Sequence, residues 1–254
     1  MPGLRGLAGR NILITGAASG IGRATALRLG EERATVLILD LDGEGAEVVA
    51  AEIRADGGRA NASAADISDA AGVEAAVAAF EEEAGPIHGL VNNAGWDLAA
   101  DFLDTEPDQW RKIIEINLYG PLNVTRSVLS RMVACGEGRI VSIASDAGRV
   151  GSSGESVYAA CKGGIISFSK SVAREVARHG ITLNVVSPGP SDTPLFANFD
   201  PSGKLAKALE RAIPMRRLGR PDDYPGLVAF LLSDEAGFIT GQTISVSGGL
   251  TMHG

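Results

Sequence analysis

The sequence has few of the residues on which metal sites and disulfide frameworks depend. Its 254 residues include two cysteines, Cys135 and Cys161, and three histidines, His88, His179 and His253. Neither cysteine belongs to a CxxC or CxxxH pair, so a zinc site is disfavoured and no disulfide framework is implied. The sequence therefore predicts no metal site, and its cysteine usage favours a reduced, cytoplasmic compartment.

Long apolar runs and basic clusters are also missing. No apolar stretch approaches the about 20 residues of a membrane span, and residues 1–10 lack the apolar core of a secretory signal. The net charge is −8 at pH 7 and the isoelectric point is about 5.0. Membranes and nucleic acids are therefore disfavoured as partners. A serine hydrolase has little support either, because the sequence contains no GxSxG motif.

Short apolar runs alternate with stretches of helical period, and this pattern predicts the fold class. We expect strands at 11–15, 34–39, 59–65, 88–91, 139–144, 182–186 and 242–246. Helices are expected at 20–32, 43–56, 71–84, 107–133, with a break near Gly120 and Pro121, and 156–178. Such alternation is typical of parallel βαβ units, and continuously apolar strands indicate that helices cover both faces of the sheet. The sequence therefore predicts an α/β protein with a doubly wound, Rossmann-type parallel sheet.

No linker-like or low-complexity segment divides the chain, so residues 1–254 are expected to form one domain. Residues 192–220 differ from the rest because they are punctuated by proline and partly basic. They lie between the last two predicted strands. We expect this segment to form a mobile cap over a substrate.

A glycine-rich segment, TGAASGIG at 15–22, joins the first predicted strand to the first predicted helix. The spacing of Gly16, Gly20 and Gly22 allows a sharp turn and a close approach of the backbone to a phosphate. The N-terminus of the following helix offers free N–H groups and the positive end of its dipole to the same phosphate. A glycine-rich turn without a ligand is the alternative. Its place after the first strand favours a dinucleotide site.

Asp40 stands at the end of the second predicted strand, about twenty residues after the glycine loop. A carboxylate there accepts hydrogen bonds from the adenosine ribose and repels a 2′-phosphate. Neither Ala17, Ala18 nor Leu41 is basic, so the sequence favours NAD over NADP. The alternative is that Asp40 only caps the next helix, a role that Asp42 could fill instead.

Tyr158 and Lys162 are four residues apart on a predicted helix, which places them on one face. A cation at about 4 Å, at an effective dielectric of about 20, is worth roughly 4 kcal/mol, or about three pKa units. Lys162 is therefore expected to lower the pKa of Tyr158 toward neutrality, so that Tyr158 can exchange a proton with an alcohol or carbonyl. Taken alone, this pair is also common on solvated helix surfaces.

Two further polar residues extend the candidate site. Ser145 ends the fifth predicted strand, where its hydroxyl could bind a substrate oxygen, whereas the rival Ser142 lies within the strand. Ser145 could instead be a turn or capping residue. Asn117 lies in a long helix, where asparagine is a poor helix former, and a water-holding or bend-making role is expected.

Together, these ordered motifs resemble the classical short-chain dehydrogenase/reductase family over nearly the whole chain. The further matches are Asp66 after the third strand, NNAG at 92–95, and Pro188 and Gly189 followed by Thr193. The resemblance implies a sheet of order 3-2-1-4-5-6-7 and a homotetramer. It implies catalytic roles for Asn117 (holding a water), Ser145 (orienting the substrate), Tyr158 (acid and base) and Lys162 (binding the nicotinamide ribose). Cofactor contacts are implied for Gly16, Ser19, Gly20, Ile21, Gly22, Asp40, Leu41, Asp66, Ile67, Asn93, Ala94, Gly95, Tyr158, Lys162, Pro188, Gly189, Ser191 and Thr193.

The segments 92–97, 145–164 and 238–254 are similar to those of family members that oxidise alicyclic β-hydroxyacyl-CoA thioesters with NAD. Trp96 could supply an apolar wall for such a substrate, beside Ser145, Tyr158 and Pro190, or it could be a core or lid residue. Three arginines could meet CoA phosphates or could be ordinary surface residues: Arg149, Arg216 and Arg217.

Other functions remain open at this point. A 3-oxoacyl thioester reductase or a dehydrogenase of another secondary alcohol would carry the same motifs. A catalytically idle dinucleotide-binding protein is a different class, which the complete Asn117, Ser145, Tyr158 and Lys162 set disfavours.

Overall fold

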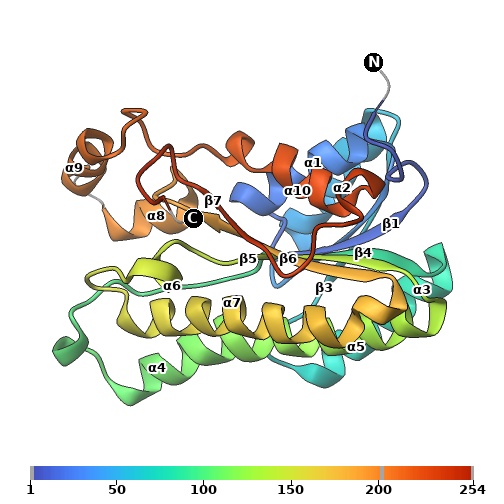
Figure 1. Ribbon diagram of the computed structural model, residues 1–254, viewed down its shortest axis with the longest axis horizontal. Helices are drawn as coiled ribbons and strands as arrows, with labels where there is room; N and C mark the ends of the chain where they lie inside the picture. The colour runs from blue at the N-terminus through green and yellow to red at the C-terminus, as the bar shows by residue number, and fades with distance from the viewer. Residues whose placement is uncertain (1–2, 201–202, 253–254) are drawn as a thin grey trace.

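The computed structural model describes residues 3–200 and 203–252 and contains one seven-stranded parallel sheet (Figure 1). The strand order β3-β2-β1-β4-β5-β6-β7 confirms the predicted topology. The strands are β1 (Asn11–Thr15), β2 (Thr35–Asp40), β3 (Arg59–Ala64), β4 (Ile87–Asn92), β5 (Gly138–Ile143), β6 (Ile181–Pro188) and β7 (Thr243–Val246).

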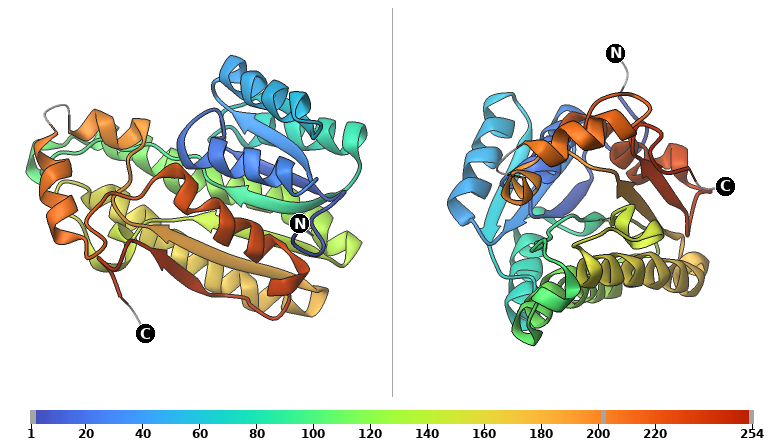
Figure 2. Two further views of the ribbon diagram at one scale, coloured as in Figure 1. Left: turned by 90° about the horizontal axis from the view of Figure 1, so that it is seen from above. Right: turned by 90° about the vertical axis from the view of Figure 1, so that its left-hand side faces the viewer.

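Helices cover both faces of the sheet, as Figures 1 and 2 show. One face packs against α1 (Gly20–Glu31), α2 (Gly43–Ala55) and α10 (Pro225–Leu232). The other packs against α3 (Ala70–Ala84), α5 (Gly120–Cys135) and α7 (Ser156–Val176). The doubly wound α/β arrangement expected from the continuously apolar strands is therefore confirmed.

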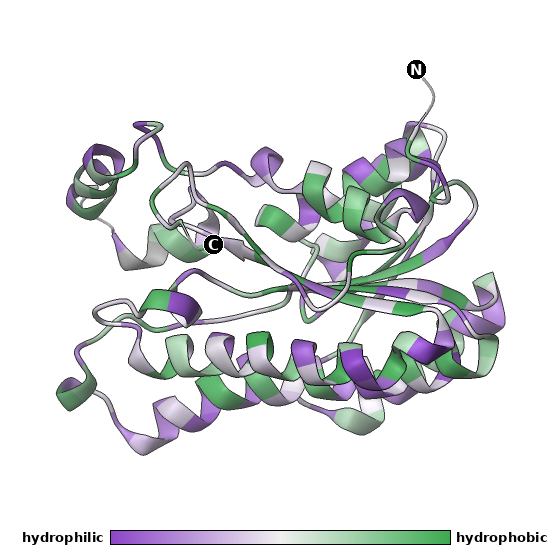
Figure 3. Cartoon of the chain, viewed as in Figure 1, coloured by the Kyte–Doolittle hydropathy of each residue, from purple (hydrophilic) through white to green (hydrophobic). Residues whose placement is uncertain are grey.

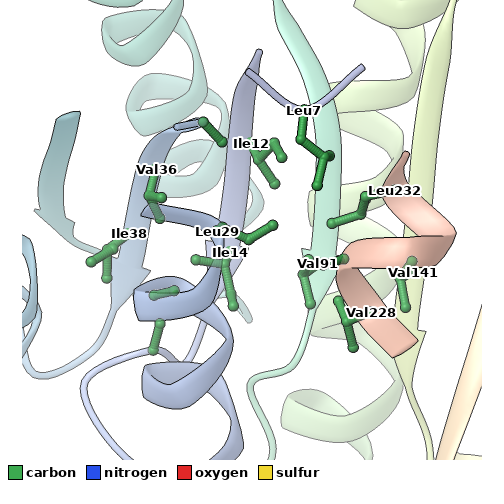
Figure 4. Packing of buried hydrophobic residues seen from close by; sticks show 14 of the residues in the cluster. Leu7, Ile12, Ile14, Leu29, Val36, Ile38, Val91, Val141, Val228 and Leu232 are labelled. Carbon is green, nitrogen blue, oxygen red and sulfur yellow. The ribbon is translucent and has the colours of Figure 1, made fainter. Parts of the chain in front are cut away.

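The core between β1 and its covering helices illustrates how the sheet is held (Figure 4). Ile12 and Ile14 of β1 lie in one buried cluster with Leu29 of α1 and with Val228 and Leu232 of α10, and each is at most 2% exposed. Full burial of such a side chain contributes about 1.5–3 kcal/mol. Figure 3 shows the same segregation, with apolar residues in the strands and mixed hydropathy along the surface helices.

Helix α10 was not predicted from the sequence. Its segment, PGLVAFLL, is apolar on nearly every side because it lies buried among α1, β5 and β6. A short, uniformly apolar run carries no helical period, so periodicity cannot identify it.

The predicted helix at 107–133 is interrupted, as expected, but slightly earlier than Gly120. It consists of α4 (Pro107–Ile114), a π-helical turn η2 (Glu115–Tyr119) and α5. Pro121 has no backbone N–H and cannot donate to the carbonyl of Asn117, four residues before it. The widened turn therefore places Asn117, which is fully buried, at the irregularity.

The segment predicted as a cap contains two short helices, α8 (Pro194–Phe199) and α9 (Lys204–Ala212), at the left of Figure 1. Residues 201–202 of this cap lie outside the described residues, as do 1–2 and 253–254 of the predicted domain. Within the described ranges, no helix is both long and apolar enough to cross a membrane. The same ranges hold no cluster of His, Cys, Asp and Glu suited to a metal ion.

Candidate functional site

A cavity of about 710 Å³ runs along the carboxyl edge of the sheet. Residues at or just after the ends of six strands line it: Gly16, Asp40, Asp66, Asn93, Ser145 and Gly189. Parallel α/β sheets bind ligands at this edge because the loops after their strands converge there. The structure thus brings nearly all the predicted site residues around one cavity.

The glycine loop forms one wall of the cavity. Gly16 has φ +67°, a left-handed conformation that favours glycine, and it lines the cavity with Ser19, Gly20 and Ile21. Asn93 braces the loop, because its Nδ2 donates to the carbonyl oxygens of Thr15 at 3.0 Å and Gly16 at 2.8 Å. The side chain of Ser19 makes no capping bond to α1, so the first N–H groups of the helix remain available to a phosphate.

Gly22 was expected to contact the cofactor, but it is buried below the loop and does not line the cavity. A methyl group at this position would overlap the Gly16 carbonyl oxygen and the Asn93 amide nitrogen. Gly22 therefore allows α1 to pack closely against the loop. Its contribution to a phosphate site is indirect.

We expect Gly22→Ala to weaken NADH binding at least about tenfold and to lower Tm, since overpacking typically costs about 1–3 kcal/mol. Gly226→Ala in α10 is the matched control, because its added methyl group meets no atom within 4 Å. Fluorescence titration of NADH and thermal melts of both variants test this prediction. Equal NADH affinity in wild type and Gly22→Ala would contradict it.

Asp40 ends β2 and lines the cavity, where the sequence predicts that the adenosine ribose binds. Its Oδ2 accepts from the N–H of Ala18 at 2.9 Å, and its Oδ1 accepts from that of Asp42 at 3.0 Å. The capping role belongs to Asp42, which accepts from Gly45 at the start of α2. Asp40 is thus free of the capping role considered above and faces the cavity with Leu41, Asp66 and Ile67.

The charges lining the cavity are unevenly distributed. The carboxylates of Asp40 and Asp66 line the cavity at the ends of β2 and β3, whereas the two lysines among its described lining residues lie beside aromatic rings. Lys112 lies against Trp96, and Lys162 lies beside Tyr158. The described lining residues therefore include no cation other than these two lysines.

Ser145, Tyr158 and Lys162 meet where β5 ends and α7 begins. Ser145 and Tyr158 both line the cavity, and an interaction with the Ser145 side chain acts to lower the pKa of the Tyr158 phenol. Ser145 Oγ accepts from Ala147 N at 3.1 Å. Lys162 is 4% exposed; its Nζ donates to the Ile143 carbonyl at 3.1 Å and lies 5.3 Å from the Tyr158 ring centroid. The three side chains are thus adjacent, as their spacing predicts.

The expected pKa of Tyr158 requires correction. Burial raises the pKa of Tyr158 above its usual value, and the negative charges of Glu155 and Asp97 add to the rise, while the interaction with the Ser145 side chain opposes it. Burial also lowers the pKa of Lys162 to about 8. The four-residue spacing predicted that Lys162 lies beside Tyr158, but it could not predict that Tyr158 is buried. Burial has the larger effect on the pKa of the Tyr158 phenol.

Asn117 does not line the cavity. Its Nδ2 donates to the carbonyls of Trp96 at 2.5 Å and Ile113 at 2.9 Å, and its Oδ1 accepts from Trp96 N at 3.3 Å. The side chain thus fixes the segment after the NNAG motif. The bend-making role considered for Asn117 fits the π-helical turn.

The loop after β6 closes the nicotinamide end of the predicted site. The lining residues there are Pro188, Gly189, Pro190, Ser191 and Thr193. The Ser191 hydroxyl is bonded to the carbonyl of Gly189 at 2.7 Å and to the hydroxyl of Tyr224, while the Thr193 hydroxyl caps α8 by accepting from Phe196 N. Their side chains are therefore used mainly to shape this loop.

One part of the cavity lining is apolar and was only partly predicted. Trp96 and Pro190 line it, together with Val150, Leu195, Phe196, Leu205, Leu209 and Leu250. Lys112 of α4, whose Nζ lies 4.0 Å from the Trp96 ring centroid, and Glu155 also line the cavity. No sequence motif marks these two residues, because they come from elements far apart in the chain.

None of the three arginines considered for CoA phosphates lines the cavity. Arg217 forms an ion pair with Asp223 at 2.5 Å, and the guanidinium of Arg216 donates to the Arg211 carbonyl. The expectation that Arg149, Arg216 and Arg217 face the substrate site therefore finds no support in this conformation.

The chain matches known proteins over nearly its full length. The model of the family described as enoyl-(acyl carrier protein) reductase matches residues 16–251. A 3-oxoacyl-[acyl-carrier-protein] reductase, FabG of Thermotoga maritima, is 36% identical over 97% of this chain and 99% of its own length. The (2S)-[(R)-hydroxy(phenyl)methyl]succinyl-CoA dehydrogenase subunit BbsD of Thauera aromatica is 38% identical over 97% and 98%.

Among solved structures, a 3-ketoacyl-(acyl-carrier-protein) reductase from Brucella melitensis in complex with NADH superposes with a TM-score of 0.90. It is 36% identical, and the match covers 97% of this chain and 100% of the other. The fold, the cavity and these similarities agree. The chain belongs to the classical short-chain dehydrogenase/reductase family and is an oxidoreductase acting on secondary alcohol or ketone groups.

Proposed function

We propose that the protein interconverts a secondary alcohol and a ketone with NAD, and that Tyr158 carries the proton. The main support is Asp40, which lines the cavity without capping α2 and has no lining cation beside it. A carboxylate in this place favours a free ribose over a 2′-phosphate. NAD is therefore the proposed cofactor, held by the cavity-lining residues of the glycine loop, Asp40, Asp66 and the loop after β6.

The proposed chemistry rests on three side chains. Ser145 holds the substrate oxygen, and Tyr158 gives that oxygen a proton in reduction or accepts one in oxidation. Lys162 keeps a positive charge beside Tyr158 and binds the ribose of the cofactor. When bound, the nicotinamide exchanges the hydride, and its oxidised form adds a second positive charge that favours the phenolate. Asn117 supports this arrangement by fixing Trp96.

We expect Asp40→Ala to reduce the preference for NAD+ over NADP+ at least about tenfold in kcat/KM, because the carboxylate no longer repels the 2′-phosphate. Asp42→Asn is the matched control: it removes a neighbouring charge but keeps a side chain able to cap α2. The absorbance of the reduced nicotinamide reports both rates. A wild-type preference for NADP+ would overturn the argument.

For the substrate, we propose a β-hydroxyacyl-CoA such as 2-hydroxycyclohexanecarboxyl-CoA. The local resemblance at 92–97, 145–164 and 238–254 supports it, as does a relative named for a succinyl-CoA derivative. Trp96 and Pro190 would form the wall against the ring, and the helices of residues 192–220 would act as a mobile cap. A 3-oxoacyl thioester reductase is the second candidate, favoured by the relatives named 3-oxoacyl-[acyl-carrier-protein] reductase.

A substrate panel separates these proposals. We expect β-hydroxyacyl-CoA thioesters to reduce NAD+ with a kcat/KM at least about a hundredfold above that of the matching free acids, alcohols and sugars. Higher activity on 3-oxoacyl thioesters of acyl carrier protein would favour the second candidate. Absence of thioester activity, with activity on free alcohols, would reject both.

Two further proposals concern assembly and location: the family resemblance supports a homotetramer, and the low cysteine content supports a cytoplasmic location. Light scattering at micromolar concentration tests the first, and a monomer would reject it. Large apolar side chains exposed in the single chain, such as Leu103, Tyr119 and Phe238, are compatible with burial in an assembly.

A further inference from the structure

Asp97 is a buried carboxyl group that the proposed reaction does not use. It follows Trp96 directly and is 5% exposed. Its Oδ1 accepts from Leu98 N at 2.8 Å, whereas no N–H or hydroxyl group of the described residues reaches Oδ2. A buried carboxylate oxygen without a donor is costly. Some other group must therefore satisfy this oxygen.

The segments that carry Asp97 and Glu155 lie against each other, because Ala100 N donates to the Gly154 carbonyl at 2.9 Å. An interaction with the Glu155 side chain contributes to the raised pKa of Asp97, so we assign the Glu155 carboxyl as the partner of this oxygen. Two ionised carboxylates cannot bond to each other, so such a contact requires a proton on one of them. Glu155 precedes the first residue of α7 and lines the cavity. The two residues, 58 positions apart in the chain, thus form one acidic pair where the cavity meets the start of α7.

The pair lies next to the proposed proton carrier. The charges of Glu155 and Asp97 both raise the pKa of Tyr158, and the charge of Asp97 also raises that of Lys162. The charged and titratable neighbours are Glu155, just before α7, and three residues on α7: Tyr158, Cys161 and Lys162. The neighbour from α4 is Lys112, over the Trp96 ring. The number of negative charges on the pair therefore changes the ionisation of both proposed catalytic groups.

We propose that Asp97 and Glu155 share one proton at neutral pH and act as positioning residues that set the charge around Tyr158 and Lys162. Its effect on turnover rests on the proposed function, whereas the shared proton itself does not. With the proton shared, the pair carries one negative charge, which supports the buried Lys162 cation. When the proton is lost, a second negative charge opposes ionisation of Tyr158.

The shared proton has a consequence for stability that needs no enzyme assay. The pKa of Asp97 is raised to about 7 by burial and by Glu155, above the roughly 3.9 of an unfolded chain. At a pH between these two pKa values, the folded protein therefore holds a proton that the unfolded chain has lost. The free energy of unfolding falls as the pH rises through this range. Asp97→Asn removes this dependence.

Thermal melts between about pH 5 and pH 8 test this consequence. We expect the Tm of wild type to fall relative to that of Asp97→Asn by about 3 °C or more over this range. The control is Asp108→Asn, an exposed carboxylate paired with Arg111, whose Tm should run parallel to that of wild type. Parallel Tm curves for wild type and Asp97→Asn would overturn the shared proton whether or not the enzyme turns over.

The pH dependence of alcohol oxidation tests the effect on the reaction. At a pH above about 7, where wild type carries the second negative charge, Asp97→Asn and Glu155→Gln should each move the acid limb of the kcat/KM profile to lower pH by about one unit, because neither variant can gain the second charge that opposes the phenolate. A purely structural role would lower kcat/KM without moving this limb. Unshifted profiles in both variants would overturn the proposal, and if Asp97→Asn does not fold, Glu155→Gln decides alone.

Discussion

Tyr158→Phe should lower kcat/KM for alcohol oxidation and ketone reduction by about 10²–10⁴ while leaving NADH affinity within about twofold of wild type. The substitution removes only the phenolic hydroxyl, and the ring keeps its place on α7. Steady-state rates and NADH titration measure the two quantities separately. The large loss is expected because no other tyrosine is found among the described lining residues.

Tyr119→Phe is the control for this variant. Tyr119 is 57% exposed in the π-helical turn and does not line the cavity, so its loss of a hydroxyl should leave kcat/KM unchanged. A Tyr158→Phe enzyme with wild-type kcat/KM would show that another group carries the proton.

Lys162→Met should separate activity from stability. We expect kcat/KM to fall at least about a hundredfold, because the positive charge beside Tyr158 is lost. We expect Tm to stay unchanged or to rise, because a buried ammonium with one protein hydrogen bond, to Ile143 at 3.1 Å, is replaced by an apolar chain of similar length. Thermal melts and steady-state rates on the same preparation measure both effects.

Lys170→Met provides a matched control on the same helix. Lys170 is exposed two turns further along α7, and its substitution should change neither kcat/KM nor Tm appreciably. A Lys162→Met enzyme that keeps wild-type kcat/KM, or that loses activity only because it unfolds, would contradict the role proposed for the cation.

The fold and much of the site were predictable from the sequence because local patterns determine them. Apolar runs alternating with helical stretches indicated the parallel sheet, and the four-residue spacing brought Tyr158 and Lys162 onto one face of α7. The end of the second strand placed Asp40 at the cavity, since carboxyl ends of parallel strands share one edge.

What could not be predicted depends on contacts between distant elements. The Asp97–Glu155 pair joins residues from two loops, and Lys112 reaches Trp96 from α4. The direction of the Tyr158 pKa shift was wrong because burial is a property of the packed structure, whereas the spacing of Lys162 is a property of the chain. Gly22 was predicted to contact the cofactor because the glycine motif is the same whether a glycine makes room for a ligand or for a neighbouring stretch of the protein.

The central claim is that Tyr158 transfers the proton in an NAD-linked reaction. Single-turnover decay of NADH absorbance, after mixing excess enzyme–NADH with a β-ketoacyl-CoA, tests it most directly because it isolates chemistry from product release. The account predicts that wild type oxidises an amount of NADH equal to the β-ketoacyl-CoA added, and that Tyr158→Phe does so at a rate about 10²–10⁴ lower at equal NADH occupancy. A Tyr158→Phe transient as fast as that of wild type would contradict it.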